Sequence, residues 1–166
     1  MSSLLSHHRQ YFRLLIISLV LLHAPLVAAQ GNIDERKTNE YATAFWDSFN
    51  NDLSNGKLDE YLSHWDEKAE RITPTVHARG IEEIRATYES YLAAFSDFHQ
   101  LETRRIVDGN VIVSELITTA RDNATGKVLR LPNVAIVEVN EKGKVTRARV
   151  YLDTGKFNPP PPSLTK

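Results

Sequence analysis

The residues best suited to binding an organic molecule are aromatic ones on the predicted helices. Tryptophan and tyrosine join a large apolar ring to a polar N–H or O–H group, so they can line a pocket for a flat, oxygenated ligand. Their helical spacing fits a plain hydrophobic core as well, and both interpretations stay open. The aromatic residues that we expect at a pocket are Trp46, Tyr61, Trp65, Tyr88 and Tyr91.

A second group of reactive side chains alternates along the last predicted strand. Arg147, Arg149, Tyr151 and Asp153 are two residues apart, so they share one face of that strand. We expect this face to point inward, which places Arg149 and Tyr151 in the pocket beside Asp153. A structural Arg–Asp ion pair, or a strand end that faces solvent, is the alternative.

Two further residues are candidates for the mouth of a pocket. Glu115 interrupts an apolar run, where it either anchors a substrate or points outward. His77 follows a short extended segment and could shuttle protons, although a lone histidine there is more often an exposed loop residue. The histidines lack HxH or HExxH spacing and the chain has no cysteine, so we expect neither a metal site nor a cofactor.

Three helical segments precede the strands and must position these side chains. Residues 34–53 repeat apolar side chains every three to four positions, which predicts a long helix. A short second helix has an apolar face running from Leu58 to Trp65. Pro74 excludes a helix at residues 72–76, which we expect to be extended, and Gly80 begins the third helix.

The second half of the chain reads as β-structure. Four segments rich in Val, Ile and Thr are joined by short turns, which predicts a four-stranded antiparallel meander. Pro132 cannot donate a backbone hydrogen bond, so we expect a bulge or an edge there. A curved sheet that covers three helices gives an α+β fold with an open mouth suited to small ligands. The predicted strands are Phe98–Val107, Val111–Arg121, Lys127–Val139 and Lys144–Asp153.

The first 29 residues have the features of a secretory signal peptide. A weakly basic start precedes an apolar run at residues 14–22, and small residues end the segment at Ala29. The run is shorter than the ~20 residues that cross a membrane, although a retained anchor is the alternative. We therefore expect a protein that is secreted, or lies in the lumen of the secretory pathway, without membrane contact after cleavage. The predicted parts are a signal peptide (1–29), a single domain (30–157) and a Pro-rich tail (158–166).

Composition narrows the classes of function. Hydrophobic residues make up 42% of the 166 residues and charged ones 25%, which is ordinary for one globular domain. The predicted leader holds two arginines and no acid, so 18 basic and 21 acidic residues remain, a net charge of −3. That balance argues against nucleic acid as a partner. Asn123 begins an Asn-Ala-Thr sequon in a polar turn, which predicts N-glycosylation after export.

Five short motifs, taken in their order and spacing, resemble one known family. They are Asn55-Gly56-Lys57-Leu58-Asp59, Ile72-Thr73-Pro74, Arg79-Gly80-Ile81-Glu82-Glu83-Ile84-Arg85, Val107-Asp108-Gly109-Asn110-Val111 and residues 142–153. Through them the stretch from Glu40 to Phe157 resembles the SnoaL-like polyketide cyclases of the nuclear transport factor 2-like superfamily. The resemblance implies a cone-shaped curved antiparallel sheet wrapped around three N-terminal helices, the nuclear transport factor 2-like or cystatin-like fold.

The resemblance also implies a role for Asp153, which matches the general acid/base aspartate in the last strand of the cyclases. A carboxyl group in a largely apolar pocket can exchange protons with a carbon acid or a carbonyl. The carboxylate base of steroid isomerase-type relatives is replaced here by Thr73. Nearby Asp66, Glu67 and Glu70 are expected on a solvated polar turn. We therefore expect a domain that binds a hydrophobic small molecule, with cofactor-independent cyclisation or isomerisation through Asp153.

The alternative is a non-catalytic secreted module for ligand binding or dimerisation. Members of the superfamily often pair through the convex face of the sheet, and an exposed antiparallel face suits a symmetric homodimer. The small or β-branched residues expected on that face are Thr118, Ala120, Thr146, Ala148 and Val150.

Overall fold

The structure is a computed structural model that describes residues 34–153. The predicted signal peptide and the Pro-rich tail lie outside the described residues, so both stay predictions. Within residues 34–153, no helix is both long enough and apolar enough to cross a bilayer.

The predicted long helix is confirmed as α2 (Glu35–Asn51). Its first turn is capped by Asp34, whose carboxylate accepts a hydrogen bond of 2.9 Å from the backbone N–H of Arg36. A short 3₁₀ turn, η2 (Leu53–Asn55), follows, and Gly56 ends it with a φ of 75°, where glycine pays no steric cost. The apolar face of α2 is buried and comprises Ala42, Phe45, Trp46 and Phe49.

Six strands form one sheet in the order β2-β1-β6-β5-β4-β3. The predicted meander is confirmed, because β3, β4, β5 and β6 pair antiparallel in sequence order. The pair β1–β6 is parallel, so the sheet is mixed and not purely antiparallel as expected. The strands are β1 (Trp65–Ile72), β2 (His77–Arg79), β3 (Phe95–Asp108), β4 (Val111–Asp122), β5 (Val128–Val139) and β6 (Val145–Leu152).

The region between the first and third predicted helices differs from expectation. The second helix, α3 (Leu58–Leu62), is shorter than predicted, and Trp65 begins β1. The expected polar turn at Asp66, Glu67 and Glu70 is therefore wrong: these residues belong to β1. Glu70 tolerates the strand because Arg79 and Arg147 pair with its carboxylate at 3.5 Å and 3.2 Å.

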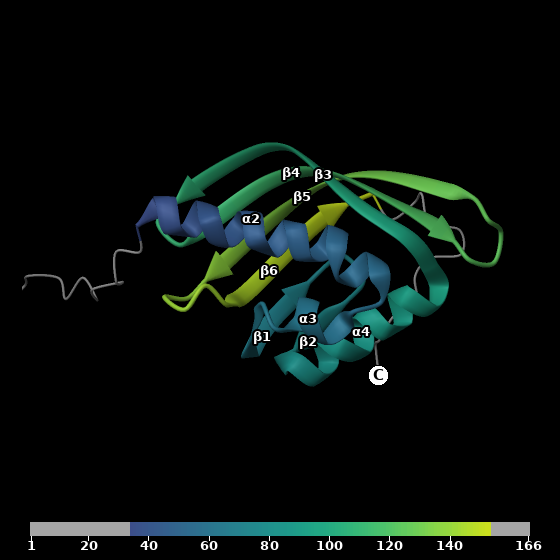
Figure 1. Cartoon of the computed structure of the whole chain (residues 1–166), viewed down its shortest axis with the longest axis horizontal. Coiled ribbons are helices and arrows are strands. Elements are labelled where there is room, and N and C mark those ends of the chain that lie inside the picture. The colour runs from purple at the N-terminus through teal and green to yellow at the C-terminus, as the bar shows by residue number, and fades with distance from the viewer. Residues whose placement is uncertain (1–33, 154–166) are drawn as a thin grey trace, which may run out of the picture. The chain divides into compact units, whose positions relative to one another are not determined.

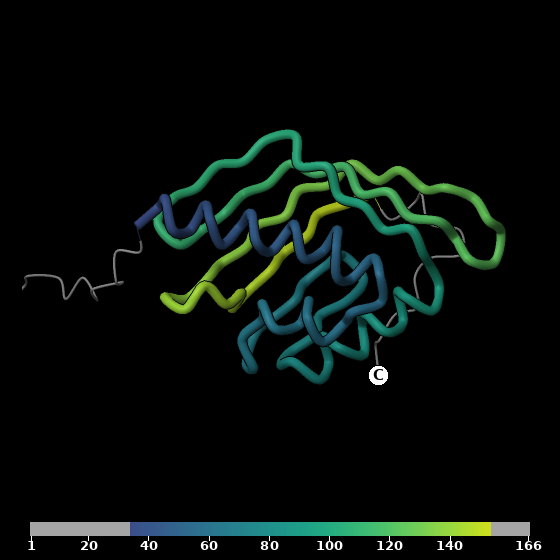
Figure 2. The backbone as a smooth tube through the Cα atoms, viewed as in Figure 1, coloured from purple at the N-terminus to yellow at the C-terminus, as the bar shows by residue number. Residues whose placement is uncertain are grey.

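Among residues 34–153, Pro132 lies where β5 has a strand partner on one side only, which suits a residue without an N–H. It pairs with Ile117 of β4, whereas the register between β5 and β6 begins at Asn133 and Leu152 among the described residues. Beyond this point the β4–β5 hairpin continues away from β6, as the tube in Figure 2 shows. The predicted edge position is confirmed.

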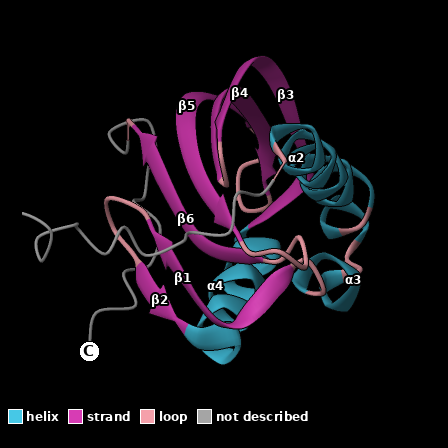
Figure 3. Cartoon of the chain, turned by 90° about the vertical axis from the view of Figure 1, so that its left-hand side faces the viewer, coloured by secondary structure: helices cyan, strands magenta, loops and turns pink. Residues whose placement is uncertain are grey.

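The helices all lie on the concave side of the curved sheet. Figure 1 shows α2 crossing that side near β3, and Figure 3 shows the sheet bending around the helices. The third helix, α4 (Gly80–Ala94), packs against β1 and β2 at the other end of the strand order. Sheet and helices therefore enclose an interior between them, which is the α+β cone that the sequence predicts.

Candidate functional site

The interior holds a cavity of about 130 Å³ between the helices and the concave face of the sheet. A cavity needs at least about 10–15 Å³ of volume for each water that it holds, so this one has room for roughly ten waters or one small organic molecule. Its helical wall is mostly aromatic. The helical residues that line it are Phe45, Trp46, Phe49, Leu53, Tyr61, Tyr88, Tyr91 and Leu92.

The strands supply the opposite wall through their alternation. Every second residue of a strand faces the same side, and along β5 the lining residues are all odd-numbered. The lining residues on the last two strands are Leu131, Asn133, Ala135, Val137, Ala148, Val150 and Leu152.

All five aromatic residues predicted at a pocket lie at this cavity, which is lined by Trp46, Tyr61, Trp65, Tyr88 and Tyr91. All of them except Tyr91 are buried as well, so these four serve as core and as cavity wall together. Tyr61 stacks on Phe45 with ring centroids 5.4 Å apart, which fixes its ring in place.

The prediction that this face of β6 points inward is wrong. Arg149, Tyr151 and Asp153 do share one face, but it is the outer one: Tyr151 is 56% exposed and Asp153 is exposed at the strand end. Arg149 pairs with Glu138 at 2.6 Å on the same outer face. The reason is hydrophobic: the residues that alternate with them on β6 are apolar, and the sheet buries that set. Asp153 therefore provides no carboxylate to the cavity.

Two other predicted site residues also lie outside the cavity. Glu115 is exposed on the outer face of β4, 3.7 Å from Arg104, which settles its two interpretations in favour of the outward one. His77 is exposed on β2, with its Nε2 3.9 Å from a carboxylate oxygen of Glu70. Neither side chain can reach a molecule in the interior.

The prediction that small and β-branched strand residues form the outer, dimer-forming face of the sheet is wrong. Thr118, Ala120, Ala148 and Val150 line the cavity instead. Their small size leaves the interior hollow where larger side chains would fill it. Thr146 does not line the cavity, and its hydroxyl donates to the backbone carbonyl of Glu138.

Arg71 is the one cationic side chain in the described lining of the cavity, and the sequence did not single it out. It lies on β1 beside Ala148 of β6 and is 8% exposed. Its Nε donates a 3.2 Å hydrogen bond to the hydroxyl of Tyr88. The guanidinium carbon is 5.0 Å from the ring centroid of Tyr88 and 5.2 Å from that of Tyr91, within cation–π range.

A chain of hydroxyl groups continues from Arg71. The Tyr88 and Tyr61 oxygens are 2.9 Å apart, and burial raises the pKa of the Tyr61 hydroxyl well above its usual value. Burial by itself disfavours the charge on Arg71, but the oxygens of Tyr88 and Tyr91 more than offset this, so the pKa of Arg71 is raised. At neutral pH Arg71 is therefore a fixed cation.

A second polar position lies on the other side of β6 from Arg71. The hydroxyl of Thr118 on β4 accepts hydrogen bonds from the side-chain amides of Gln100 at 3.1 Å and Asn133 at 2.8 Å. The amide oxygens of Gln100 and Asn133 are buried and have no partner among residues 34–153. All three residues line the cavity, so their polar side chains would border a bound molecule.

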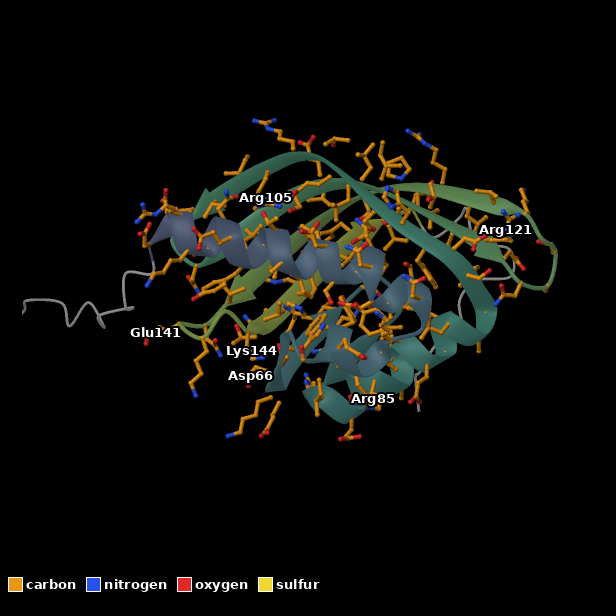
Figure 4. The ribbon with its side chains drawn as sticks, viewed as in Figure 1. Asp66, Arg85, Arg105, Arg121, Glu141 and Lys144 are labelled. Atoms are coloured by element: carbon orange, nitrogen blue, oxygen red, sulfur yellow. The ribbon has the colours of Figure 1, made fainter. Side chains whose placement is uncertain are left out.

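The side chain of Arg105 lies outside the cavity lining, between β3 and α2 (Figure 4). It pairs with Glu102 at 2.5 Å, and its Nη1 donates to the backbone carbonyl of Asn39 at 2.9 Å. Glu102 also accepts a 2.5 Å hydrogen bond from Ser114, whose hydroxyl oxygen accepts from Trp46 Nε1 at 3.2 Å. This network fixes α2 to the sheet and satisfies its polar groups.

The described lining contains neither a carboxylate nor an imidazole. Thr73, at the place of the isomerase base, does line the cavity, but its hydroxyl oxygen accepts the backbone N–H of Val76 at 3.0 Å. Among residues 34–153, no three His, Cys, Asp or Glu side chains lie close enough to hold a metal ion. The arrangement can bind and orient a molecule, but it lacks a group that accepts protons at neutral pH.

Solved structures with the same fold come from several bacteria. A candidate SnoaL-like polyketide cyclase from Jannaschia sp. CCS1 superposes with a TM-score of 0.65 at 16% identity, covering 79% of this chain and 94% of that one. The epoxide hydrolase/cyclase-like enzyme SalBIII, which has a role in pyran ring formation in salinomycin, gives 0.64 at 16% identity, covering 74% and 95%. An epoxide hydrolase from M. tuberculosis gives 0.60 at 16% identity, covering 72% and 88%.

At identities this low, the superpositions establish the fold and not the reaction. No functionally curated protein is similar enough to this chain to count as a relative. The family model of the SnoaL-like domain matches residues 42–148, which hold every helix-borne and strand-borne residue of the cavity except Val150 and Leu152. On that match, this chain belongs to the SnoaL-like domain family.

Proposed function

We propose that this domain binds a hydrophobic small molecule in its interior cavity without transforming it. One observation carries the proposal: the cavity is lined by aromatic and aliphatic side chains, and its described lining has no carboxylate or imidazole. Proton transfer at neutral pH needs such a group within hydrogen-bond reach of the substrate. Binding needs only a fitting apolar hollow with a few polar contacts, which this cavity offers.

The test fills the cavity from the middle of the sheet. Ala135 is fully buried on β5 and lines the cavity, so Ala135→Phe places a ring inside it. We expect binding of the neutral fluorescent probe N-phenyl-1-naphthylamine to weaken at least about five-fold, since overlap with a packed wall costs about 1–3 kcal/mol. The control is Ala44→Phe, at an exposed position of α2. Equal binding by wild type and Ala135→Phe, with both folded by circular dichroism, would refute the proposal.

A cofactor-independent cyclase or isomerase is the second candidate, supported by the likeness to SalBIII. A carboxylate at Asp153 cannot serve it, because that residue lies outside the cavity. The enzyme would depend on hydrogen-bond donation by Arg71 and Tyr88 to an oxygen that gains charge. Turnover of an epoxide or polyketide substrate that disappears in Tyr88→Phe would favour this candidate over simple binding.

We also propose that two copies pair through the outer face of the sheet. Leu101, Ile106 and Tyr151 are half exposed on strands β3 and β6 of that face. Outward residues of the strands between them are apolar too: Val113 and Ile136 are paired across β4 and β5. Sedimentation should give a dimer that Ile106→Lys converts to a monomer. A wild-type monomer at high concentration would end this proposal.

Export remains a proposal that rests on the leader and on the sequon. Asn123 is exposed in the turn between β4 and β5, where a glycosyltransferase can reach it. Expression of the full chain in a eukaryotic secretory host should give a product that begins at Gln30 and loses mass on enzymatic deglycosylation. N-terminal sequencing that finds Met1 on the product would exclude the cleaved leader.

A further inference from the structure

Arg71 is buried in the cavity wall without an acidic partner. Among residues 34–153, no carboxylate oxygen lies within 4.0 Å of its guanidinium, and its Nη1 is buried without a hydrogen-bond partner. By contrast, the half-buried arginines among residues 34–153 all have an acid beside them. The half-buried ones pair as Arg85–Asp59, Arg105–Glu102, Arg147–Glu70 and Arg149–Glu138.

Such a charge is costly unless something compensates it. Moving an ion into a protein interior is unfavourable even after the surroundings relax. The rings of Tyr88 and Tyr91 offset part of this penalty through their cation–π contacts with the guanidinium. They leave the planar fork of Arg71 with donors that have no acceptor. A guanidinium fork matches a carboxylate, which accepts two parallel hydrogen bonds from it.

We propose that the bound molecule is a hydroxylated, apolar carboxylic acid whose carboxylate pairs with Arg71. This inference rests on the proposed function, since it names the class of ligand for the same cavity. The rings of Phe45, Trp46 and Phe49 enclose the apolar body. The carboxylate meets the cation on β1, where the neighbouring Tyr88 hydroxyl can donate a further hydrogen bond.

The second polar position accounts for the hydroxyl group of the ligand. The unpartnered amide oxygens of Gln100 and Asn133 lie on β3 and β5, whereas Arg71 lies on β1, beyond β6. A hydroxyl both donates and accepts, so it satisfies these amides whichever way they are turned. The ligand therefore has its two polar ends apart, with an apolar body between them.

The experiment compares two flat probes that differ only in charge, 2-naphthoate and its amide, 2-naphthamide. We expect wild-type protein to bind 2-naphthoate roughly ten-fold or more tightly than 2-naphthamide, since a hydrogen bond to a charged group is worth about 1.5–3 kcal/mol. In Arg71→Met the ratio should fall to about one, with the affinity for 2-naphthamide changed less than about three-fold. Arg105→Met, which removes an arginine outside the lining, should keep the wild-type ratio.

The outcomes separate this inference from the proposed function. If 2-naphthamide binds at least as tightly as 2-naphthoate to wild type, the anionic ligand is refuted while binding itself stands. If wild type binds neither probe nor N-phenyl-1-naphthylamine, the proposed function falls together with the inference. Should Arg71→Met fail to fold, the wild-type ratio still decides, and Arg71→Lys should keep part of the preference because it keeps the charge but not the fork.

Discussion

Arg71 and Arg105 both carry a largely buried guanidinium, yet their surroundings differ. Arg105 is held by Glu102 at 2.5 Å and by Asn39 of α2, so it joins a strand to a helix. Arg71 has two tyrosine rings and one hydroxyl, and no acid among the described residues. The first arrangement is complete by itself and stabilises the fold. The second is incomplete, which is typical of a group kept for a ligand.

The largest expected effect comes from giving Arg71 the acid that Arg105 already has. Ala148 is the register partner of Arg71 on β6 and lines the cavity, so Ala148→Asp sets a carboxylate beside it. In the Arg71→Met background the same aspartate is buried without a partner. We expect it to cost about 3 kcal/mol more of unfolding free energy there than in the wild-type background. A double-mutant cycle by urea denaturation measures this; additive effects would mean that Arg71 is not available to an acid.

Removing each arginine tests the comparison directly. Arg105→Met leaves Glu102 without its cation, and we expect unfolding free energy to fall by about 2 kcal/mol, less than for a fully buried pair because both side chains keep some exposure. Arg71→Met replaces an unpaired charge by an apolar chain of similar length, so stability should stay within about 1 kcal/mol of wild type or rise. Thermal and urea unfolding of both variants decide. A larger loss for Arg71→Met would make Arg71 a structural residue.

The hydroxyl chain beside Arg71 predicts a weaker, pH-dependent effect. Burial raises the pKa of Tyr61 in the folded state, whereas in the unfolded chain it titrates near 10. Above about pH 10 the unfolded state therefore binds fewer protons, and stability falls as pH rises, by up to about 1.4 kcal/mol per pH unit. Unfolding curves between pH 9 and 11 should be less steep in pH for Tyr61→Phe than for wild type. Parallel pH profiles would contradict the burial of this hydroxyl.

The fold was largely predictable because its signals are local. Apolar spacing marked α2, and turn residues marked the strands of the meander. The first strand was missed because Asp66, Glu67 and Glu70 are as polar as a loop. Only long-range pairing with β6, and arginines that neutralise Glu70, make that sequence a strand. These tertiary contacts outweighed the low strand propensity of the acidic sequence.

The site was half predictable for a related reason. The aromatic residues on the helices could be predicted at a pocket from their type and spacing. Which face of a strand points inward depends, however, on the residues that alternate with the candidate residues along that strand. On β6 that set is Ala148, Val150 and Leu152, and its apolar character was the available signal that Arg149 and Tyr151 point outward. Arg71 alternates with the buried Ala69, and this period of two was the only local hint of its inward direction.

The parallel contact between β1 and β6 has a consequence for how the protein is made. Arg71 and Ala148 are neighbours in the sheet but 77 residues apart in the chain, and a ribosome releases the segment with Arg71 long before the one with Ala148. Contacts of such separation form late, because a long loop must close first. During synthesis the arginine therefore stays in water, and its charge is withdrawn from solvent only when the final strand inserts between β1 and β5.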